Sequence, residues 1–548
     1  MYRLASTLAL LLASTTAVAQ PAFDPARITA DVRTLSSDAF EGRGPATPAE
    51  TRTVAYIVRQ MQAAGLQPGG TPDASGKRGW TQDVPLLRSE ITGTPTLGMT
   101  IAGTATPLTQ GTQIAVRAAL TGQKQVAIQN APLVFVGYGV AASERNWDDF
   151  NGQDLKGKIA VVLINDPDFE TGQGDFGGKA MTYYGRWTYK YEEAARRGAA
   201  GILIVHETAP ASYGWATVKN SNTNTMFDIV RTNPTSSHTA MEGWIQRDLA
   251  VQLFKASGLD FDAEKAKAQT RGFRPVPLKA TFTARYAVDA KVITSKNVLG
   301  RLPGTTHPDD TVIYSAHWDH LGIGQPDAKG DRIYNGAVDN ATGVAALLEL
   351  GRAYAKAPRT ARSVVFLAVT AEEKGLLGSE YYAANPVYPL GQTVGVLNMD
   401  SMAVTGPAHD FGISGSAKLG LLDMLTAEGT KRNRRFSPEP HPEAGSFYRS
   451  DHFPMAKRGV PAISFDGGSD LVEGGAARGE ALSRAYVQDR YHQPADEWSP
   501  DWNLAGMTAD LDLLYAVGHD LASGTAWPNW STDSEFRAER DKTAAQRR

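Results

Sequence analysis

The sequence predicts an α/β protein built around a doubly wound, mainly parallel sheet. From Lys296 onward, apolar strand-like runs alternate with helical segments, which is the pattern of such a sheet. A region of short β-like runs separated by Gly and Pro precedes it, from about Trp80 to about Tyr286. With 548 residues the chain is long enough for more than one domain. We therefore expect a parallel-sheet domain combined with a β-rich second region.

The first twenty residues, "MYRLASTLALLLASTTAVAQ", have the features of a secretory signal. A basic start is followed by an apolar stretch from Leu4 to Ala13 and by the small residues around Ala19. We predict cleavage after residues 1–19, with a mature chain that begins near Gln20. The protein should then be exported, to the periplasm of a bacterium or into the medium. The apolar stretch is too short to span a bilayer and no later run of about 20 apolar residues exists, so we expect no stable membrane insertion.

The composition is that of an ordinary soluble globular protein. Hydrophobic residues make up 42% and charged residues 21%, and the formal net charge is −3. This balance predicts no nucleic-acid partner. The glycine-rich stretches "GYG" and "GGSDLVEGG" lack the Lys and Ser/Thr of a phosphate-binding loop, which excludes a nucleotide site. There are no cysteines, so disulfides are excluded and any metal must be bound by His, Asp and Glu.

The expected elements follow in order along the chain. Residues 24–66 have helical periodicity and end at a Gly and a Pro. In the middle region "APLVFVGYGV" and "LKGKIAVVLINDPD" are typical of strands, and "YEEAARRGAAGILIVHE" of a helix that leads into a strand. Beyond Lys296 the predicted strands are "NVLGRLPG", "TVIYSAH", "SVVFLAV", "TVGVLNMD" and "VPAISF". The predicted helices there are "NATGVAALLELGRAYAKA", one from Leu419 and one around 505–521.

Histidines and carboxylates stand at the ends of these strands. In open α/β sheets the ligand site lies beyond the carboxyl ends of the strands, so these residues are expected to converge. His317 and Asp319 end "TVIYSAHWDH", Glu372 and Glu373 follow "SVVFLAVTA", and Asp400 follows "TVGVLNM". Asp339 precedes a helix start, and "DRYHQPADEW" contains His492 and Asp496.

Such a mixture of donors suits zinc. Zinc binds imidazole nitrogen and carboxylate oxygen, and two zinc ions that share a bridging carboxylate would use the whole set. Cobalt or manganese would also accept these nitrogen and oxygen donors. Asp319 follows His317 by two residues and Asp496 follows His492 by four, which is the placing of acids that orient ligand imidazoles.

Six ordered motifs resemble those of the di-zinc exopeptidases of clan MH, which include bacterial leucine aminopeptidases, glutamate carboxypeptidases and glutaminyl cyclases. They are "SAHWDHLG", "NGAVDNATG", "TAEEKGLLGSEYY", "NMDS", "YRSDHFPMAKRGVPAISF" and "YHQPADE". The resemblance covers nearly all of residues 296–523. It implies that His317 and Asp400 bind one zinc and that Glu373 and His492 bind the other. It also implies Asp339 as the bridge, and hence two Zn²⁺ per chain.

The same resemblance implies the catalytic roles. Glu372 resembles the general base that activates the metal-bound water, and Tyr448 resembles a residue that stabilises the oxyanion. A cis peptide bond between Asp339 and Asn340 is also implied. The expected activity is removal of N-terminal residues from peptides. The alternatives are a carboxypeptidase, which requires arginines directed into the pocket, a glutaminyl cyclase, and a catalytically dead peptide-binding protein. Side-chain preference and oligomeric state are left open by the sequence.

The middle region resembles a second family. "VFVGYGVAASERNWDDFNGQDLKGKIAVVL" and "YKYEEAARRGAAGILIVHE" are similar to a protease-associated (PA) domain, which implies an insertion that covers the active site. The predicted organisation is a signal peptide (1–19), the N-terminal part of the peptidase domain with the lead-in to the insertion (20–125), a PA-like insertion (126–286), the di-zinc peptidase domain (287–530) and a disordered tail (531–548).

Several polar residues near these motifs are predicted to have ordinary structural or solvated roles. His320 and His452 are expected to be structural or to support a metal ligand, and Asp466 and Asp470 to belong to a polar loop. The same holds for four arginines that could otherwise bind a substrate carboxylate, namely Arg449, Arg478, Arg484 and Arg490.

Overall fold

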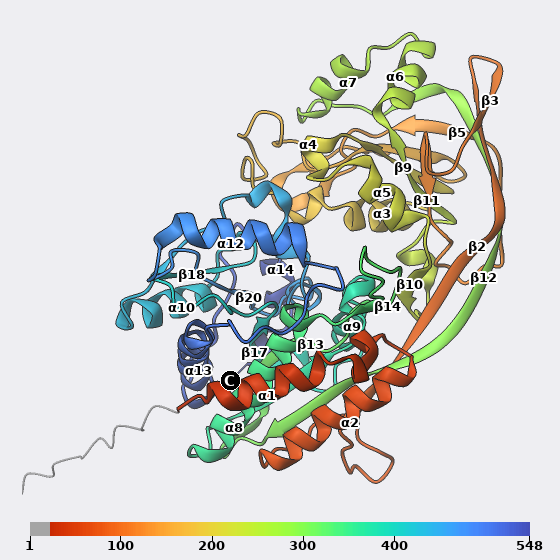
Figure 1. Ribbon diagram of the computed structural model, residues 1–548. Helices are drawn as coiled ribbons and strands as arrows, with labels where there is room; N and C mark the ends of the chain where they lie inside the picture. The colour runs from red at the N-terminus through yellow and green to blue at the C-terminus, as the bar shows by residue number, and fades with distance from the viewer. Residues whose placement is uncertain (1–21, 548) are drawn as a thin grey trace, which may run out of the picture.

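The computed structural model describes residues 22–547. It contains two lobes joined by a long, curved two-stranded ribbon (Figure 1). The ribbon consists of β2 (Thr81–Ile101) and β12 (Val276–Leu302), which pair antiparallel from Thr81 opposite Val298 to Ile101 opposite Ala280. The large lobe comprises residues 22–80 and 303–547, and the inserted lobe comprises residues 102–275. The predicted signal sequence, 1–19, lies outside the described residues.

The large lobe is built on a mainly parallel sheet, which confirms the predicted fold class. Its central strands β20, β17, β13 and β16 are parallel neighbours, with antiparallel β12 beside β16 and antiparallel β18 beside β20. Every residue of β16 and β17 is buried. Their continuous apolar runs arise because helices or loops cover both faces of a parallel sheet. The bounds are β13 (His307–His317), β16 (Arg362–Val369), β17 (Thr393–Met399), β18 (Asp410–Ile413), β19 (Arg435–Phe436) and β20 (Ala462–Gly467).

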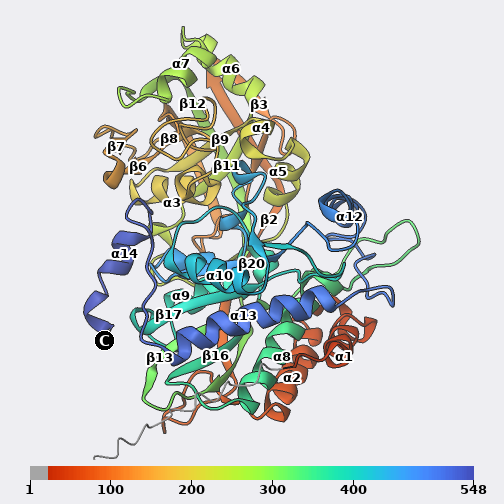
Figure 2. The same ribbon diagram turned by 90° about the vertical axis from the view of Figure 1, so that its left-hand side faces the viewer.

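Helices flank this sheet. α8 and α13 contact each other as well as β13, β16 and β17, and α13 lies across these strands in Figure 2. α9 contacts α11, which packs on β20. The N-terminal helices α1 and α2 pack against α8. The bounds are α1 (Pro25–Leu35), α2 (Pro48–Ala63), α8 (Gly343–Lys356), α9 (Leu377–Ala384), α10 (Gly420–Lys431), α11 (Phe453–Ala456), α12 (Gly475–Asp489), α13 (Ala505–Ser523) and α14 (Arg537–Asp541).

The inserted lobe continues the same sheet through β12, in the order β12-β5-β8-β9-β11-β4. It carries helices as well as strands, and α3 leads into β9 as the sequence predicts. β4 already pairs with β11, so the lobe begins before the predicted border at residue 126. The bounds are β3 (Thr104–Leu108), β4 (Ile114–Val116), β5 (Gln125–Phe135), β8 (Ile159–Leu163), β9 (Gly201–His206), β10 (Met226–Ile229), β11 (Met241–Gln246), α3 (Trp187–Arg196), α4 (Thr208–Ala211), α5 (Trp215–Asn222), α6 (Arg247–Ala256) and α7 (Phe261–Ala268).

The C-terminal segment is ordered, so the prediction of a disordered tail is wrong for residues 531–547. Trp530 and Phe536 are buried and their rings lie 4.9 Å apart. Arg540 is 1% exposed, and its guanidinium group donates hydrogen bonds to the carbonyls of Leu390 and Thr393. The charged composition of the segment conceals these few anchoring residues. Among the described residues, no helix is both long and apolar enough to cross a membrane.

Candidate metal centre

The predicted site residues meet at the carboxyl ends of three neighbouring strands. His317 is the last residue of β13, Glu372 and Glu373 follow β16, and Asp400 follows β17. Asp339 lies in the segment that leads into α8. The sheet order β17-β13-β16 therefore places these side chains along one edge.

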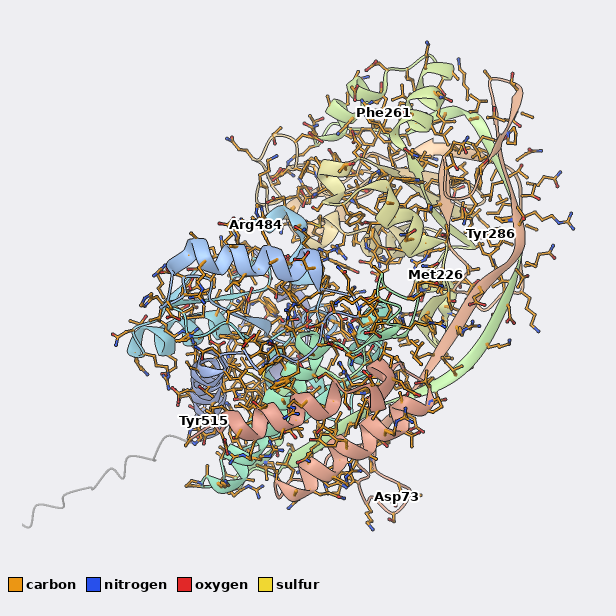
Figure 3. All side chains as sticks on the ribbon, in the orientation of Figure 1. Asp73, Met226, Phe261, Tyr286, Arg484 and Tyr515 are labelled. Carbon is orange, nitrogen blue, oxygen red and sulfur yellow. The ribbon has the colours of Figure 1, made fainter. Side chains whose placement is uncertain are left out.

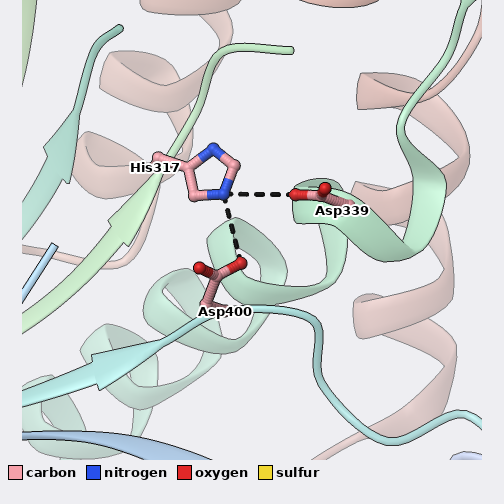
Figure 4. Close-up of side chains that lie close together, drawn as sticks. All are labelled: His317, Asp339 and Asp400. Carbon is pink, nitrogen blue, oxygen red and sulfur yellow. Dashed lines mark hydrogen bonds and ion pairs between the residues drawn. The ribbon is translucent and has the colours of Figure 1, made fainter. Parts of the chain in front are cut away.

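One cluster is formed by His317, Asp339 and Asp400 (Figure 4). His317 Nε2 lies 3.2 Å from Asp339 Oδ1 and 3.2 Å from Asp400 Oδ1. The second carboxylate oxygen of Asp400 accepts a hydrogen bond of 2.7 Å from Ser450 Oγ. Three ligand atoms from three different segments are thus held within 4.8 Å of one another.

A second cluster shares Asp339 with the first. His492 Nε2 lies 3.2 Å from Asp339 Oδ2 and 3.2 Å from Glu373 Oε2. His320 Nδ1 lies 2.6 Å from Glu373 Oε1, and its ring is fully buried. Because the two oxygens of Asp339 face different histidines, this one carboxylate joins both clusters.

The loop that carries Asp339 is fixed by its neighbour Asn340. The Asp339–Asn340 peptide bond is cis, as the resemblance implies. Asn340 Oδ1 accepts hydrogen bonds from the amides of Gly343 (2.9 Å) and Ser401 (3.1 Å), and Asn340 Nδ2 donates to the Met399 carbonyl (3.0 Å). Asn340 thereby ties the Asp339 loop to the residues on both sides of Asp400.

The two acids predicted to orient imidazoles, Asp319 and Asp496, instead accept hydrogen bonds from backbone amides. Asp496 accepts hydrogen bonds from the amides of Val338 and Asp339, each of 3.1 Å, so it supports the Asp339 loop rather than His492. Asp319 Oδ1 accepts the amide of Glu372 (3.1 Å) and lies 3.9 Å from His317 Nδ1, whereas the Asp319 carbonyl lies 3.1 Å from that nitrogen. The sequence reveals that these acids are close to the centre but not which groups they bind.

Tyr448 differs from the expectation. Its hydroxyl donates to Glu535 Oε1 at 3.0 Å, and its ring packs against Tyr183 of the inserted lobe and against Phe453. None of the metal-ligand candidates is among its hydrogen-bond partners in the described chain. These contacts of Tyr448 join the C-terminal segment to the two lobes, and its oxyanion role stays a prediction.

Glu372 and Glu373 have different surroundings. Glu373 contacts two histidines, whereas the Glu372 carboxylate has no ion-pair partner among the residues described. Burial raises the pKa of Glu372 well above its ordinary value, as does repulsion from Asp400 and Glu373, although the charge of His317 opposes this. A carboxyl group with no ion-pair partner in the described chain thus lies beside the two clusters.

Three other flagged residues have ordinary roles. His452 is buried edge-on against Phe447 at a centroid distance of 4.6 Å, and burial lowers its pKa to about 3. Arg484 pairs with Glu480 on the exposed helix α12 (Figure 3), and Asp470 accepts a hydrogen bond from Arg435. Sequence reasoning assigned no role to Ser450, although Ser450 lies within the motif "YRSDHFPMAKRGVPAISF", or to Arg43, whose "EGRG" stretch lies far upstream.

The donor set fits a divalent metal. Burial opposes a charge on His317, but Asp400 and Glu372 outweigh it and raise its pKa well above the ordinary value. Burial opposes a charge on Asp339 too, yet hydrogen bonds from His317 and His492 hold its pKa well below the usual range. The clusters thus attract positive charge, and nitrogen and oxygen donors in this arrangement are those that zinc takes.

Comparison with known proteins agrees with this geometry. Residues 297–516 match the profile of peptidase family M28, and this segment contains both clusters. Residues 297–516 of the chain therefore belong to peptidase family M28. The match to the M28 family begins at β12 and ends within α13, so it leaves out the inserted lobe and the N-terminal helices.

Individual relatives of this M28 protein match more weakly. Leupeptin-inactivating enzyme 1 of Streptomyces exfoliatus is 28% identical over 286 residues, covering 50% of this chain and 57% of that protein. Aminopeptidase NAALADL1 of Mus musculus is 35% identical over 113 residues, covering 20% of this chain and 14% of that one. The chain therefore matches less than two thirds of the length of either. The solved aminopeptidase from Aneurinibacillus sp. strain AM-1 is 20% identical, with a TM-score of 0.48 over 91% of this chain and 94% of that chain.

Proposed function

We propose that this M28 protein is an exported di-zinc aminopeptidase. The observation that carries the proposal is the position of Asp339, whose two carboxylate oxygens each lie 3.2 Å from a different histidine. A carboxylate shared in this way is what a bridge between two metal ions requires. Export rests on the predicted signal sequence alone.

The described side chains divide into two ligand sets. His317 and Asp400 would hold one zinc, Glu373 and His492 the other, and Asp339 both. When bound, two zinc ions polarise a peptide carbonyl and make water more acidic. His320 Nδ1 lies 2.6 Å from Glu373 Oε1, and His320, Asp339 and Glu373 together form a group that could also hold a metal ion. The same donors accept cobalt or manganese.

Glu372 is proposed as the general base. Its carboxylate is not engaged by a ligand histidine, and the amide of Glu372 is anchored by Asp319. It can accept the proton of the attacking water and then transfer it to the leaving amine. Glu373, the next residue, faces the metal ligands instead, so proton transfer and metal binding are separated between adjacent residues.

An exposed carboxylate supports action at the N-terminus of peptides. β17 and β20 are parallel, with Met399 opposite Phe465, so Asp466 lies beside Asp400 at the ends of these strands. Asp466 has exposed surface, but desolvation of its carboxyl group and repulsion from Asp510 raise the pKa of Asp466 to about 7. A substrate ammonium group would favour its charged form. Asp466 can receive the ammonium group of a substrate whose first peptide bond reaches the zinc ligands. A mammalian relative that is named an aminopeptidase also supports cleavage at the N-terminus of the substrate.

One observation favours a carboxypeptidase as the second candidate. Arg186 of the inserted lobe is 9% exposed, and its Nε has no hydrogen-bond partner among the described residues. Burial lowers the pKa of Arg186 to about 10, and repulsion from Arg449 is the next largest cause. Two guanidinium groups without carboxylate partners can bind the C-terminal carboxylate of a peptide. A glutaminyl cyclase is less well supported, because that branch of the resemblance works with one zinc while both ligand sets remain here.

The deciding experiment is mass spectrometry of a defined peptide mixture after incubation with zinc-reconstituted enzyme. We expect ladders that shorten from the N-terminus. Shortening from the C-terminus would make the carboxypeptidase correct and identify Arg186 and Arg449 as the residues to vary. Intact peptides with two bound zinc ions would refute both peptidase assignments, and absence of zinc after reconstitution would leave a peptide-binding protein.

The inserted lobe is proposed to act as a PA-like cover that limits which peptides reach the centre. It contacts the large lobe beside the site, where the amide of Met181 donates to the carbonyl of Pro442 at 3.1 Å. A Cβ at Gly445, four residues before Arg449, would lie 2.6 Å from Met181 Sδ. The absence of a side chain at Gly445 therefore lets the inserted lobe approach the 445–450 turn closely.

A further inference from the structure

A buried arginine from the N-terminal segment lies beneath the proposed metal centre. Arg43 is 1% exposed and ends a turn in which Glu41, Gly42 and Arg43 all have positive φ. A Cβ at Gly42 would lie 2.4 Å from the Tyr334 carbonyl oxygen and 2.7 Å from that of Gly322. Only glycine fits at position 42, so the turn packs closely against the backbone at Gly322 and Tyr334.

The guanidinium group of Arg43 binds four backbone carbonyls. Its Nε donates to Trp318 (2.9 Å) and its Nη2 to Gly336 (2.8 Å). Its Nη1 donates to Leu35 (2.8 Å) and Asn335 (2.6 Å). Trp318 directly follows His317, while Asn335 and Gly336 begin the loop that reaches Asp339. One planar group therefore joins the segments that carry two of the proposed zinc ligands.

Asp496 binds the other end of the Asp339 loop. Asp496 accepts hydrogen bonds from the amides of Val338 and Asp339, whereas Arg43 donates hydrogen bonds to the carbonyls of Asn335 and Gly336. In the segment 335–339, the carbonyls at one end are bound by the cation Arg43, and the amides at the other end are bound by the anion Asp496. The positive charge of Arg43 and the negative charge of Asp496 both favour this orientation of the peptide groups. The two residues therefore fix the position of Asp339 from both ends of its loop.

No carboxylate of the described chain lies within ion-pair distance of Arg43. Burial lowers the pKa of its guanidinium to about 10, against the attraction of Asp339, Asp496, Asp319 and Glu373. The carbonyls hold the group in place while its charge faces the acidic centre. Burial of an arginine in this form costs stability, which would be unexpected for a residue that merely fills space.

We infer that Arg43 is a positioning residue of the metal centre, one that fixes the His317 turn and the Asp339 loop in the geometry that zinc binding needs. This assigns a function to a residue more than 250 positions before the segment that matches the M28 family. The inference rests on the proposed zinc centre but not on which end of a peptide is cleaved.

The test compares zinc affinities of the purified full-length chain by competition with a chromogenic chelator. Arg43→Lys keeps the charge but loses the planar fork, and we expect it to bind zinc about 10- to 100-fold more weakly than the wild type. The matched control is Arg540→Met, which removes another buried guanidinium that binds backbone carbonyls, at the Thr393 end of β17, opposite Asp400. Its zinc affinity should stay within about threefold of the wild type.

The zinc affinities of the variants distinguish a positioning role of Arg43 from an effect of its charge. If only the charge of Arg43 mattered, Arg43→Lys would bind zinc like the wild type and Arg43→Met would bind it more tightly, and the inference would be wrong. A lysine variant that folds only when zinc is present supports it. If that variant folds neither with nor without zinc while Arg540→Met folds, Arg43 is a general structural residue. A wild-type chain that binds no zinc would instead refute the proposed centre itself.

Discussion

Adjacent residues in a turn can perform separate tasks because their side chains diverge. Glu373 lies within 3.2 Å of two histidine nitrogens, whereas the neighbouring Glu372 carboxylate has no ion-pair partner in the described structure. Ala371, just before them, has a φ of 54°, and Asp319 receives the Glu372 amide. The turn is therefore fixed before either side chain meets metal or substrate.

The proposed base predicts a separation of metal binding from turnover. Glu372→Gln should retain both zinc ions and lose at least about 100-fold in kcat, because the amide cannot accept a proton. Zinc content by mass spectrometry and peptide hydrolysis would be measured on the same sample. Glu473→Gln, at an 87% exposed side chain, is the control and should change neither. Turnover of the Glu372 variant at the wild-type rate would assign the base elsewhere.

Position at a strand end is readable from sequence, but hydrogen-bond partners are not. His317, Glu373 and Asp400 could be placed at the site because each ends or follows an apolar run. The partners of Asp496 and Tyr448 depend on segments more than 80 residues away, the Asp339 loop and Glu535. No local pattern encodes such contacts, so the sequence indicated their vicinity and missed their function.

Among the elements, the central strands were predictable and the C-terminal segment was not. β16 and β17 are continuous apolar runs because they are buried on both faces. Residues 531–547 have few apolar members, and their order depends on single anchors. Phe536 is 5% exposed and stacks on Phe447 at 5.9 Å, next to Tyr448. A composition average does not detect a segment held by individual side chains.

This anchoring gives a stability prediction for the C-terminal segment. Phe536→Ala should lower the free energy of unfolding by about 3 kcal/mol, because it removes a buried ring and leaves a cavity. Urea denaturation followed by tryptophan fluorescence would measure it. Glu539→Ala, on helix α14 directly after Phe536 and 44% exposed, should change stability by less than about 0.5 kcal/mol. Equal stability of the Phe536 variant and the wild type would show that the segment is not docked in solution.

At the scale of the whole molecule, an ion-pair chain connects the lobes. His238 lies 3.0 Å from Glu242 and 2.9 Å from Asp228, and Asp228 pairs with Arg231 at 2.7 Å. Arg231 then reaches Glu380 of α9 at 3.5 Å. Burial would lower the pKa of His238, but Glu242 and Asp228 raise it to about 9. The imidazole is thus charged at neutral pH and holds two carboxylates together.

The raised pKa of His238 predicts a pH-dependent loss of stability. The folded state binds this proton more tightly than the unfolded chain, where the pKa is about 6.5. The stabilisation is therefore complete below pH 6.5 and is lost as the pH rises through 9, by about 3 kcal/mol. Urea unfolding at pH 6 and pH 9.5 should show this loss in the wild type and a smaller one in His238→Gln. The same pH dependence in both proteins would contradict the assignment.

The chain passes between the lobes twice, once in β2 and once in β12, and these two strands are paired. Gln82 of β2 lies opposite Asn297 of β12. Strands paired in this way are about 5 Å apart, a gap that a two-residue hairpin turn can close. The inserted lobe is thus a cassette with adjacent ends. Exchange of the lobe at this point interrupts none of the strands β13, β16 and β17, but a new lobe must replace contacts such as that of Tyr183 with Tyr448. When it does, selection of peptides and their cleavage can diverge independently in evolution or in engineering.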